Sequence, residues 1–174
     1  MKQETGRDIS KTLRLLLSIP HKILSFNEID NIAEFILHEI CHDECLDIER
    51  AAYFVDNPDF NCFKGISGID RMQEKFSKRP VWNYADDFSK HMCHSQFNKK
   101  VREVNTESTK KQDEKDFMKE VAKNLCLNNH NYHCFSLRHG NRGFFLYEPA
   151  HPHAEEFDEI MDYATALLAL CPLQ

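Results

Sequence analysis

A chain of 174 residues with 41% hydrophobic and 29% charged residues has the size and composition of one globular domain. Only five glycines and six prolines are present, which excludes collagen-like and low-complexity classes. Acidic residues outnumber basic ones, 28 to 22, so the net charge of −6 argues against a broad nucleic-acid-binding surface, which needs clustered Lys and Arg.

The N-terminal part of the chain predicts two helices. The first is expected from about Asp8 to Ser18, with Pro20 ending or kinking it. The second begins at a capping box, with Ser25 as cap and Glu28 reaching back. An apolar stripe at helical spacing follows, made of Ile29, Ile32, Ala33, Ile36, Leu37 and Ile40.

Two β-hairpins are expected. The apolar run 50–55 and the run 60–69 flank a strong turn signal at 56–59. Near the end of the chain, alternating residues from His133 and an apolar strand ending at Tyr147 flank a glycine-bearing turn. The apolar strand is typical of the middle of a sheet.

The middle of the chain gives weaker patterns, and a last helix follows the second hairpin. We expect a short helix over 69–78, extended chain over 79–84 and weak helix over 88–104. Residues 105–116 contain no aliphatic or aromatic side chain and predict a mobile loop, whose lysines form a solvated face. Helical spacing returns at 117–125, and the closing helix spans about 155–170.

This order predicts an α+β fold in which an antiparallel sheet carries the terminal helices on one face. Strands and helices do not alternate throughout the chain, which disfavours a parallel βαβ series. We expect a single domain over residues 1–174, with residues 1–24 as a helical N-terminal extension.

Four stretches carry a family resemblance: 50–56, 79–86, 138–148 and the helix at 155–170. In their order and character these stretches resemble a GAF domain. The resemblance implies a GAF/PAS-like fold and a signalling or regulatory sensor domain, which binds a small ligand or a protein partner and reports through its terminal helices. It also implies a homodimer built on those helices, for which Leu13, Leu16 and Leu17 offer a leucine stripe.

Histidine and cysteine cluster at His38, Cys41, His42 and Cys45. If the second helix continues that far, these side chains share one face, and such residues could hold Zn²⁺. Four ligands from one straight helix do not surround a tetrahedral ion, so we interpret the cluster as a polar or partner-facing surface and predict no structural zinc. Two further groups lie at 91–94 and 130–134, and a metal or haem site shared between groups stays open as an alternative.

An aromatic set suggests where a ligand binds. Phe63, Trp82, Tyr84 and Phe88 come from the second predicted strand and the segment after it, where a GAF-like fold would place a cavity wall. Apolar walls with a few polar groups are typical of small-molecule pockets; the alternative is that these rings complete the core. The sequence names neither the small molecule nor a cofactor.

Catalytic motifs are missing from the sequence. There is no Gly-x-Ser-x-Gly elbow, no Gly-rich phosphate loop and no His-Glu-x-x-His, so we expect no enzyme. A metal- or redox-responsive protein is the alternative function, and a GAF-like reductase ranks third. The polar N-terminus, the short apolar run 13–19 and the odd count of seven cysteines predict a cytoplasmic protein without membrane contact.

Overall fold

The protein is described by a computed structural model for residues 9–25, 31–73, 76, 79–151 and 157–171. Its described strands form one five-stranded antiparallel sheet in the order β3-β2-β1-β5-β4. The strands are β1 Ile48–Asn57, β2 Cys62–Asp70, β3 Asn105–Thr106, β4 Asn131–Ser136 and β5 Arg142–Pro149. The α+β class with an antiparallel sheet is therefore confirmed.

Both predicted hairpins are present. β1 pairs with β2, and β4 pairs with β5. The two hairpins join through β1 and β5, whose register places Asp56 opposite Arg142 and Tyr53 opposite Phe145. β5 thus has a neighbour on each side, as its continuous apolar sequence predicts.

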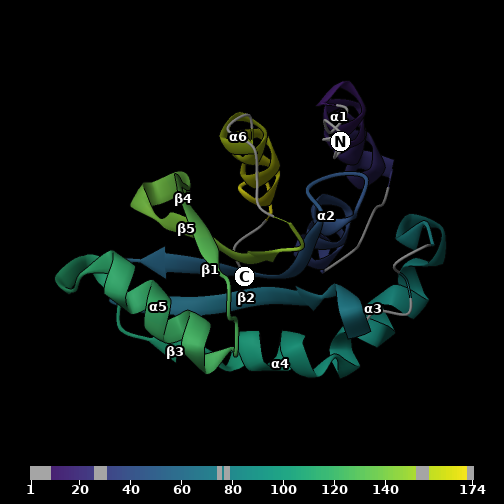
Figure 1. Ribbon diagram of the computed structural model, residues 1–174. Coiled ribbons are helices and arrows are strands. Elements are labelled where there is room, and N and C mark those ends of the chain that lie inside the picture. The colour runs from purple at the N-terminus through teal and green to yellow at the C-terminus, as the bar shows by residue number, and fades with distance from the viewer. Residues whose placement is uncertain (1–8, 26–30, 74–75, 77–78, 152–156, 172–174) are drawn as a thin grey trace, which may run out of the picture.

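The terminal helices cover one face of the sheet. α1 Ile9–Ser25, α2 Ile32–Cys41 and α6 Phe157–Leu168 contact one another and lie together above the sheet in Figure 1. Leu16 and Ile19 of α1 are buried in this layer, so the predicted N-terminal extension contributes to the core. The buried strand residues on this face are Ile48, Ala51, Tyr53, Val55, Ile69, Phe145 and Tyr147.

Two more helices cover the opposite face. α4 Gln96–Glu103 and α5 Glu114–Asn124 lie below the sheet in Figure 1, and α3 Ala85–His94 leads into α4 at one end. Strand residues on this face alternate with those of the first face, as the two-residue period of a strand requires. They are Ala52, Phe54, Phe63, Phe144 and Leu146.

Glycine allows α4 to lie directly on β2. A Cβ atom at Gly65 would lie 1.8 Å from the carbonyl oxygen of Val101, and one at Gly68 would lie 2.5 Å from its Cγ2. A side chain at Gly65 would therefore displace the backbone of α4, and one at Gly68 would displace the Val101 side chain.

The prediction for the first two helices is wrong at their junction. α1 continues through Pro20 to Ser25, and the Ser25 hydroxyl donates to the carbonyl of His21 rather than capping a new helix. Asn31 occupies the cap position of α2, while Glu28 and Ile29 lie outside the described residues. Burial of Ile19 against the helical layer stabilises the helix around the proline.

Two middle segments also differ from the prediction. Residues 79–84 are not extended, because Val81–Tyr84 forms a 3₁₀ turn with Val81 and Trp82 buried. Segment 105–116 is not a plain loop: β3 pairs with β2, and a 3₁₀ turn at Thr109–Lys111 follows. Of the short helix expected over 69–78, the described part shows a 3₁₀ turn at Arg71–Gln73. The helices predicted at 88–104 and 117–125 are confirmed as α3, α4 and α5.

None of the described helices is long and apolar enough to cross a membrane.

Candidate functional site

The predicted aromatic set does not line one cavity. Phe63 packs between Phe54 and Phe117 on the α5 face of the sheet. Trp82 and Phe88 lie on the α2 face, and Tyr84 is 49% exposed. The alternation of β2 separates Phe63 from the other rings, and ligand binding by this set stays a prediction.

Trp82 and Phe88 do meet part of the histidine cluster. Both rings contact Phe35, with centroid distances of 4.9 and 4.7 Å, and the His38 ring lies edge-on to Phe88 at 5.3 Å. A pocket of about 160 Å³ adjoins them, with His38, Glu39 and His42 in its wall. Its volume is below the usual range of small-molecule sites.

The surface interpretation of the histidine and cysteine cluster is wrong for three of its four residues, and only His42 is partly exposed. Cys41 and Cys45 are fully buried and His38 is 5% exposed, because α2 packs against the sheet on one side and against Phe76 and Phe88 on the other. Burial, partly opposed by Glu39, lowers the pKa of His38 to about 4. No disulfide joins the seven cysteines. Within the described residues, no three metal-ligating side chains are grouped to hold an ion.

A larger pocket opens at the opposite end of the sheet, and we name it the hairpin-end pocket. It has a volume of about 600 Å³, within the range of small-molecule sites. Three segments that are distant in the sequence form its wall: the β1–β2 turn, the segment before and into α5, and the β4–β5 turn with the start of β5. Its lining residues are Pro58, Asp59, Thr109, Lys110, Gln112, Glu114, Gly140 and Arg142.

A charged network supports this pocket from behind. Arg142 donates from Nη2 to Asp56 Oδ2 at 2.9 Å and from Nη1 to Glu114 Oε2 at 2.9 Å. The Thr109 hydroxyl also donates to Asp56 Oδ2, at 2.6 Å, and Thr109 bonds to Arg142. The guanidinium lies 5.1 Å from the centre of the Phe144 ring, which fixes its plane. These contacts hold Arg142 in one position.

Burial differs sharply across the network. Asp56 is fully buried, whereas the side chains of Arg142 and Glu114 are 34% and 33% exposed. Burial by itself raises the pKa of Asp56, but hydrogen bonds from Thr109, Ser108 and Arg142, together with the charge of Arg142, hold that pKa below its usual value. Asp56 is therefore an ionised anchor, and Arg142 and Glu114 face solvent from the floor of the pocket.

The same region raises the pKa values of two side chains on β4, Tyr132 and Cys134. Burial, with the neighbouring carboxylate of Glu114 as the next cause, raises the pKa of both Tyr132 and Cys134. A raised pKa keeps the Cys134 thiol protonated, so it is not an activated nucleophile. This arrangement suits recognition of a polar ligand better than covalent chemistry.

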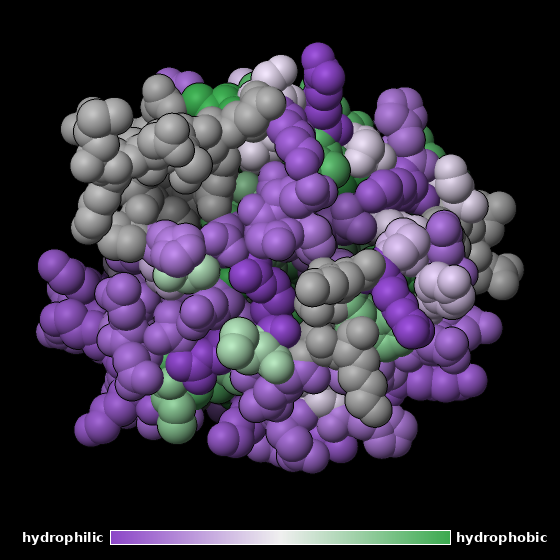
Figure 2. All heavy atoms as spheres, turned by 45° about the vertical axis from the view of Figure 1, so that its right-hand side comes forward, coloured by the Kyte–Doolittle hydropathy of each residue, from purple (hydrophilic) through white to green (hydrophobic). Residues whose placement is uncertain are grey.

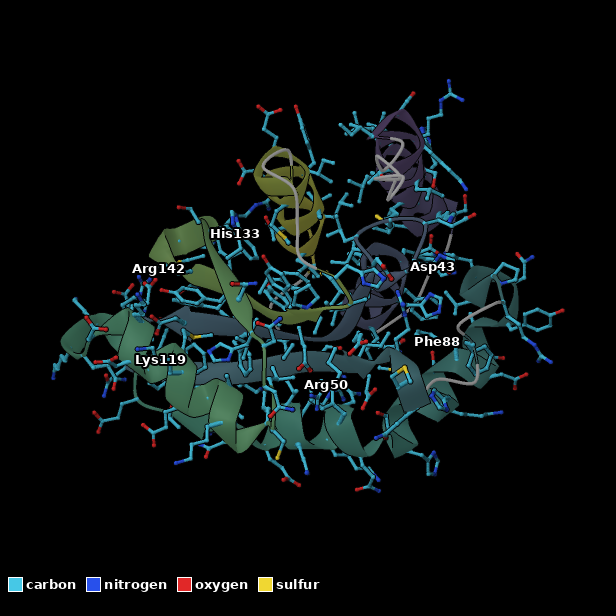
Figure 3. The ribbon with its side chains drawn as sticks, in the orientation of Figure 1. Asp43, Arg50, Phe88, Lys119, His133 and Arg142 are labelled. Carbon is cyan, nitrogen blue, oxygen red and sulfur yellow. The ribbon has the colours of Figure 1, made fainter. Side chains whose placement is uncertain are left out.

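The two regions lie far apart in the molecule. Figure 3 shows Arg142 at one end of the sheet, near the start of α5, and Phe88 and Asp43 at the other. Sequence reasoning missed the hairpin-end pocket because Asp56 and Arg142 were assigned only to turns. The signal was present: once β1 is paired with β5, the two charged residues become cross-strand partners.

No protein-family model, curated protein or solved structure matches this chain.

Proposed function

We propose that this chain is a GAF-like regulatory domain of the cytoplasm, which binds a small polar molecule in the hairpin-end pocket and is not an enzyme. One observation supports this most: three segments distant in sequence converge on a pocket whose floor is fixed by the buried Asp56–Arg142 pair. A buried ion pair is weak evidence for stability alone, because desolvation offsets much of its attraction. Its placement at a solvent-facing pocket favours a binding role.

The central strands supply a route from the pocket to the terminal helices. Arg142 lines the pocket and Asp56 lies buried behind it, while Val55 and Phe145 of the same two strands pack in the layer that contains α1, α2 and α6. Tight packing transmits small displacements. A ligand that moves the strand ends would therefore shift the helical layer.

We propose that the terminal helices form a homodimer and that a shift of the helical layer alters this dimer. The proposed interface differs from the predicted leucine stripe. Leu16 is 3% exposed and belongs to the core, so it is not part of the contact surface, whereas Leu17 of the same predicted stripe is. Leu17 and Leu24 are 71% and 79% exposed and lie two turns apart on α1, and Tyr163 on α6 is 63% exposed. Figure 2 shows hydrophobic atoms among polar ones near the top of the molecule, where α1 and α6 lie.

A thermal-shift screen with small polar metabolites tests the binding role. A compound at a hundred times its dissociation constant stabilises the folded state by about 2.7 kcal/mol, which raises the melting temperature by roughly 5–10 °C for a chain of this size. Gly140→Asn is the matched variant: Gly140 has φ +71°, which Asn tolerates, and the space around a Cβ there is open. The variant adds a polar side chain to the pocket lining, and no atom lies within 4 Å of its Cβ, so the core is not disturbed.

The expected result is at least one compound that stabilises the unmodified protein and not Gly140→Asn. Lys119→Asn, on the exposed face of α5 and outside the pocket lining, is the control and should respond like the unmodified protein. A screen in which no compound raises the melting temperature, or in which Gly140→Asn responds equally, contradicts the proposal.

A further inference from the structure

The side chains that line the hairpin-end pocket carry charges of both signs. Lys110 and Arg142 supply two positive charges, and Asp59 and Glu114 supply two negative ones. We infer that the pocket takes a small zwitterion of the free amino acid type, which carries one carboxylate and one primary ammonium group. This inference rests on the proposed ligand-binding function and names its ligand class.

Two of the four charges are available to a ligand. Lys110 and Asp59 are exposed, and among the described residues neither side chain takes part in an ion pair. They come from different segments, the turn before α5 and the β1–β2 turn. Within the part of the chain that the structure describes, a charge of each sign thus stands at the pocket wall without an ion-pair partner.

The other two charges form a fixed pair on the floor. Arg142 and Glu114 bond to each other at 2.9 Å, and Asp56 and Thr109 hold Arg142 from behind. About a third of each side chain remains exposed. A ligand carboxylate would therefore pair with Lys110 and a ligand ammonium with Asp59, over a floor where Arg142 and Glu114 are already paired.

Ligands of a single charge fit this lining poorly. A dicarboxylate or phosphate brings negative charge against Asp59 and Glu114, and a diamine brings positive charge against Lys110 and Arg142. Like charges at close range cost binding energy, and such repulsion is a usual source of specificity. A zwitterion satisfies both pairs at once, and a volume of about 600 Å³ leaves room for an amino acid side chain.

Isothermal titration calorimetry with the full chain tests the ligand class. The probes are the twenty common amino acids, the N-acetyl and carboxamide forms of any that bind, and a single-charge set of succinate, inorganic phosphate, putrescine and spermidine. We expect saturable binding of at least one free amino acid, weakened at least tenfold in both blocked forms because each loses one charged group.

Charge variants test the residues. Lys110→Gln and Asp59→Asn should fold normally, since both side chains are exposed, and each should weaken binding roughly two- to fivefold, as expected for exposed ion pairs. Lys111→Gln is the matched control, because Lys111 is an exposed neighbour that does not line this pocket. It should leave the affinity unchanged.

The outcomes separate this inference from the proposed function. If a single-charge probe binds and loses its affinity in Gly140→Asn while no free amino acid binds, the ligand class is wrong and the proposed function stands. Blocked forms that bind as tightly as the parent amino acid also overturn the ligand class alone. If no probe and no metabolite of the thermal-shift screen binds, both proposals fail.

Discussion

Replacement of Arg142 by methionine removes the guanidinium and keeps most of the side-chain volume. Asp56 then stays fully buried without its cationic partner. Removal of one member of a buried ion pair costs about 3–5 kcal/mol. Because the Arg142 side chain is 34% exposed, water reaches part of the vacated space, so we expect a loss below that range, about 2–3 kcal/mol.

Urea denaturation followed by circular dichroism measures this loss, with Asp56→Asn and the double variant as controls. Asn has no charge that needs Arg142, so the double variant should be more stable than the sum of the single losses predicts, by at least about 1 kcal/mol. A loss below about 0.5 kcal/mol in Arg142→Met, or strict additivity, would refute the claim that this pair is the anchor of the pocket.

The same pair sets a pH dependence. The pKa of Asp56 is lower in the folded protein than in the unfolded chain, since its hydrogen bonds and Arg142 outweigh burial. Its contribution to stability is therefore complete above the unfolded value of about 3.9 and is lost as the pH falls through the folded pKa. The stability difference between the unmodified protein and Arg142→Met should shrink in the same acidic range.

Three further predictions concern other parts of the molecule. Gly68→Ala places a Cβ 2.5 Å from Val101 Cγ2 and should lower the free energy of unfolding by about 1–3 kcal/mol, measured by chemical denaturation. Adding Val101→Ala should recover part of this loss. An unchanged denaturation midpoint in Gly68→Ala would contradict the close packing of α4. His38 has a folded pKa of about 4, so the free energy of unfolding should fall as the pH drops from about 6.5 to 4, by at most about 3 kcal/mol. His38→Gln should abolish this dependence of stability on pH. Leu17→Glu with Leu24→Glu should give a folded monomer by sedimentation; a dimer that survives both changes rules out this interface.

The sequence predicts the sheet well because the hairpin signals are local. Turn residues at 56–59 and 139–143 sit between apolar runs, so each hairpin depends on contacts close in the chain. Helix α5 is also predicted correctly, because the helical spacing of its apolar residues is a local signal. These elements need no knowledge of distant contacts.

The wrong predictions share a dependence on tertiary contacts. Pro20 ends a helix in isolation, yet α1 continues because its inner face is buried. Segment 105–116 has no apolar side chain, but β3 completes the sheet edge and Thr109 is buried against Asp56. Polar residues that fold against a buried charge give no periodic signal.

The candidate site was missed for a related reason. Phe63 and Trp82 are both large rings, but the face of the sheet on which Phe63 lies depends on strand register, which the sequence leaves open. Arg142 and Asp56 become neighbours only when β5 pairs with β1. The site is a product of strand order, and strand order is not a local property.

Amide chemical shifts of isotope-labelled protein are the strongest test of ligand binding in the hairpin-end pocket, because they show where a ligand binds as well as whether it does. The titration uses any compound that stabilises the protein in the thermal-shift screen. We predict saturable shifts concentrated at Asp59, Thr109, Lys110 and Gly140, with smaller ones along β1 and β5. Shifts concentrated instead around His38 and Trp82 at the other end of the sheet would contradict ligand binding in the hairpin-end pocket.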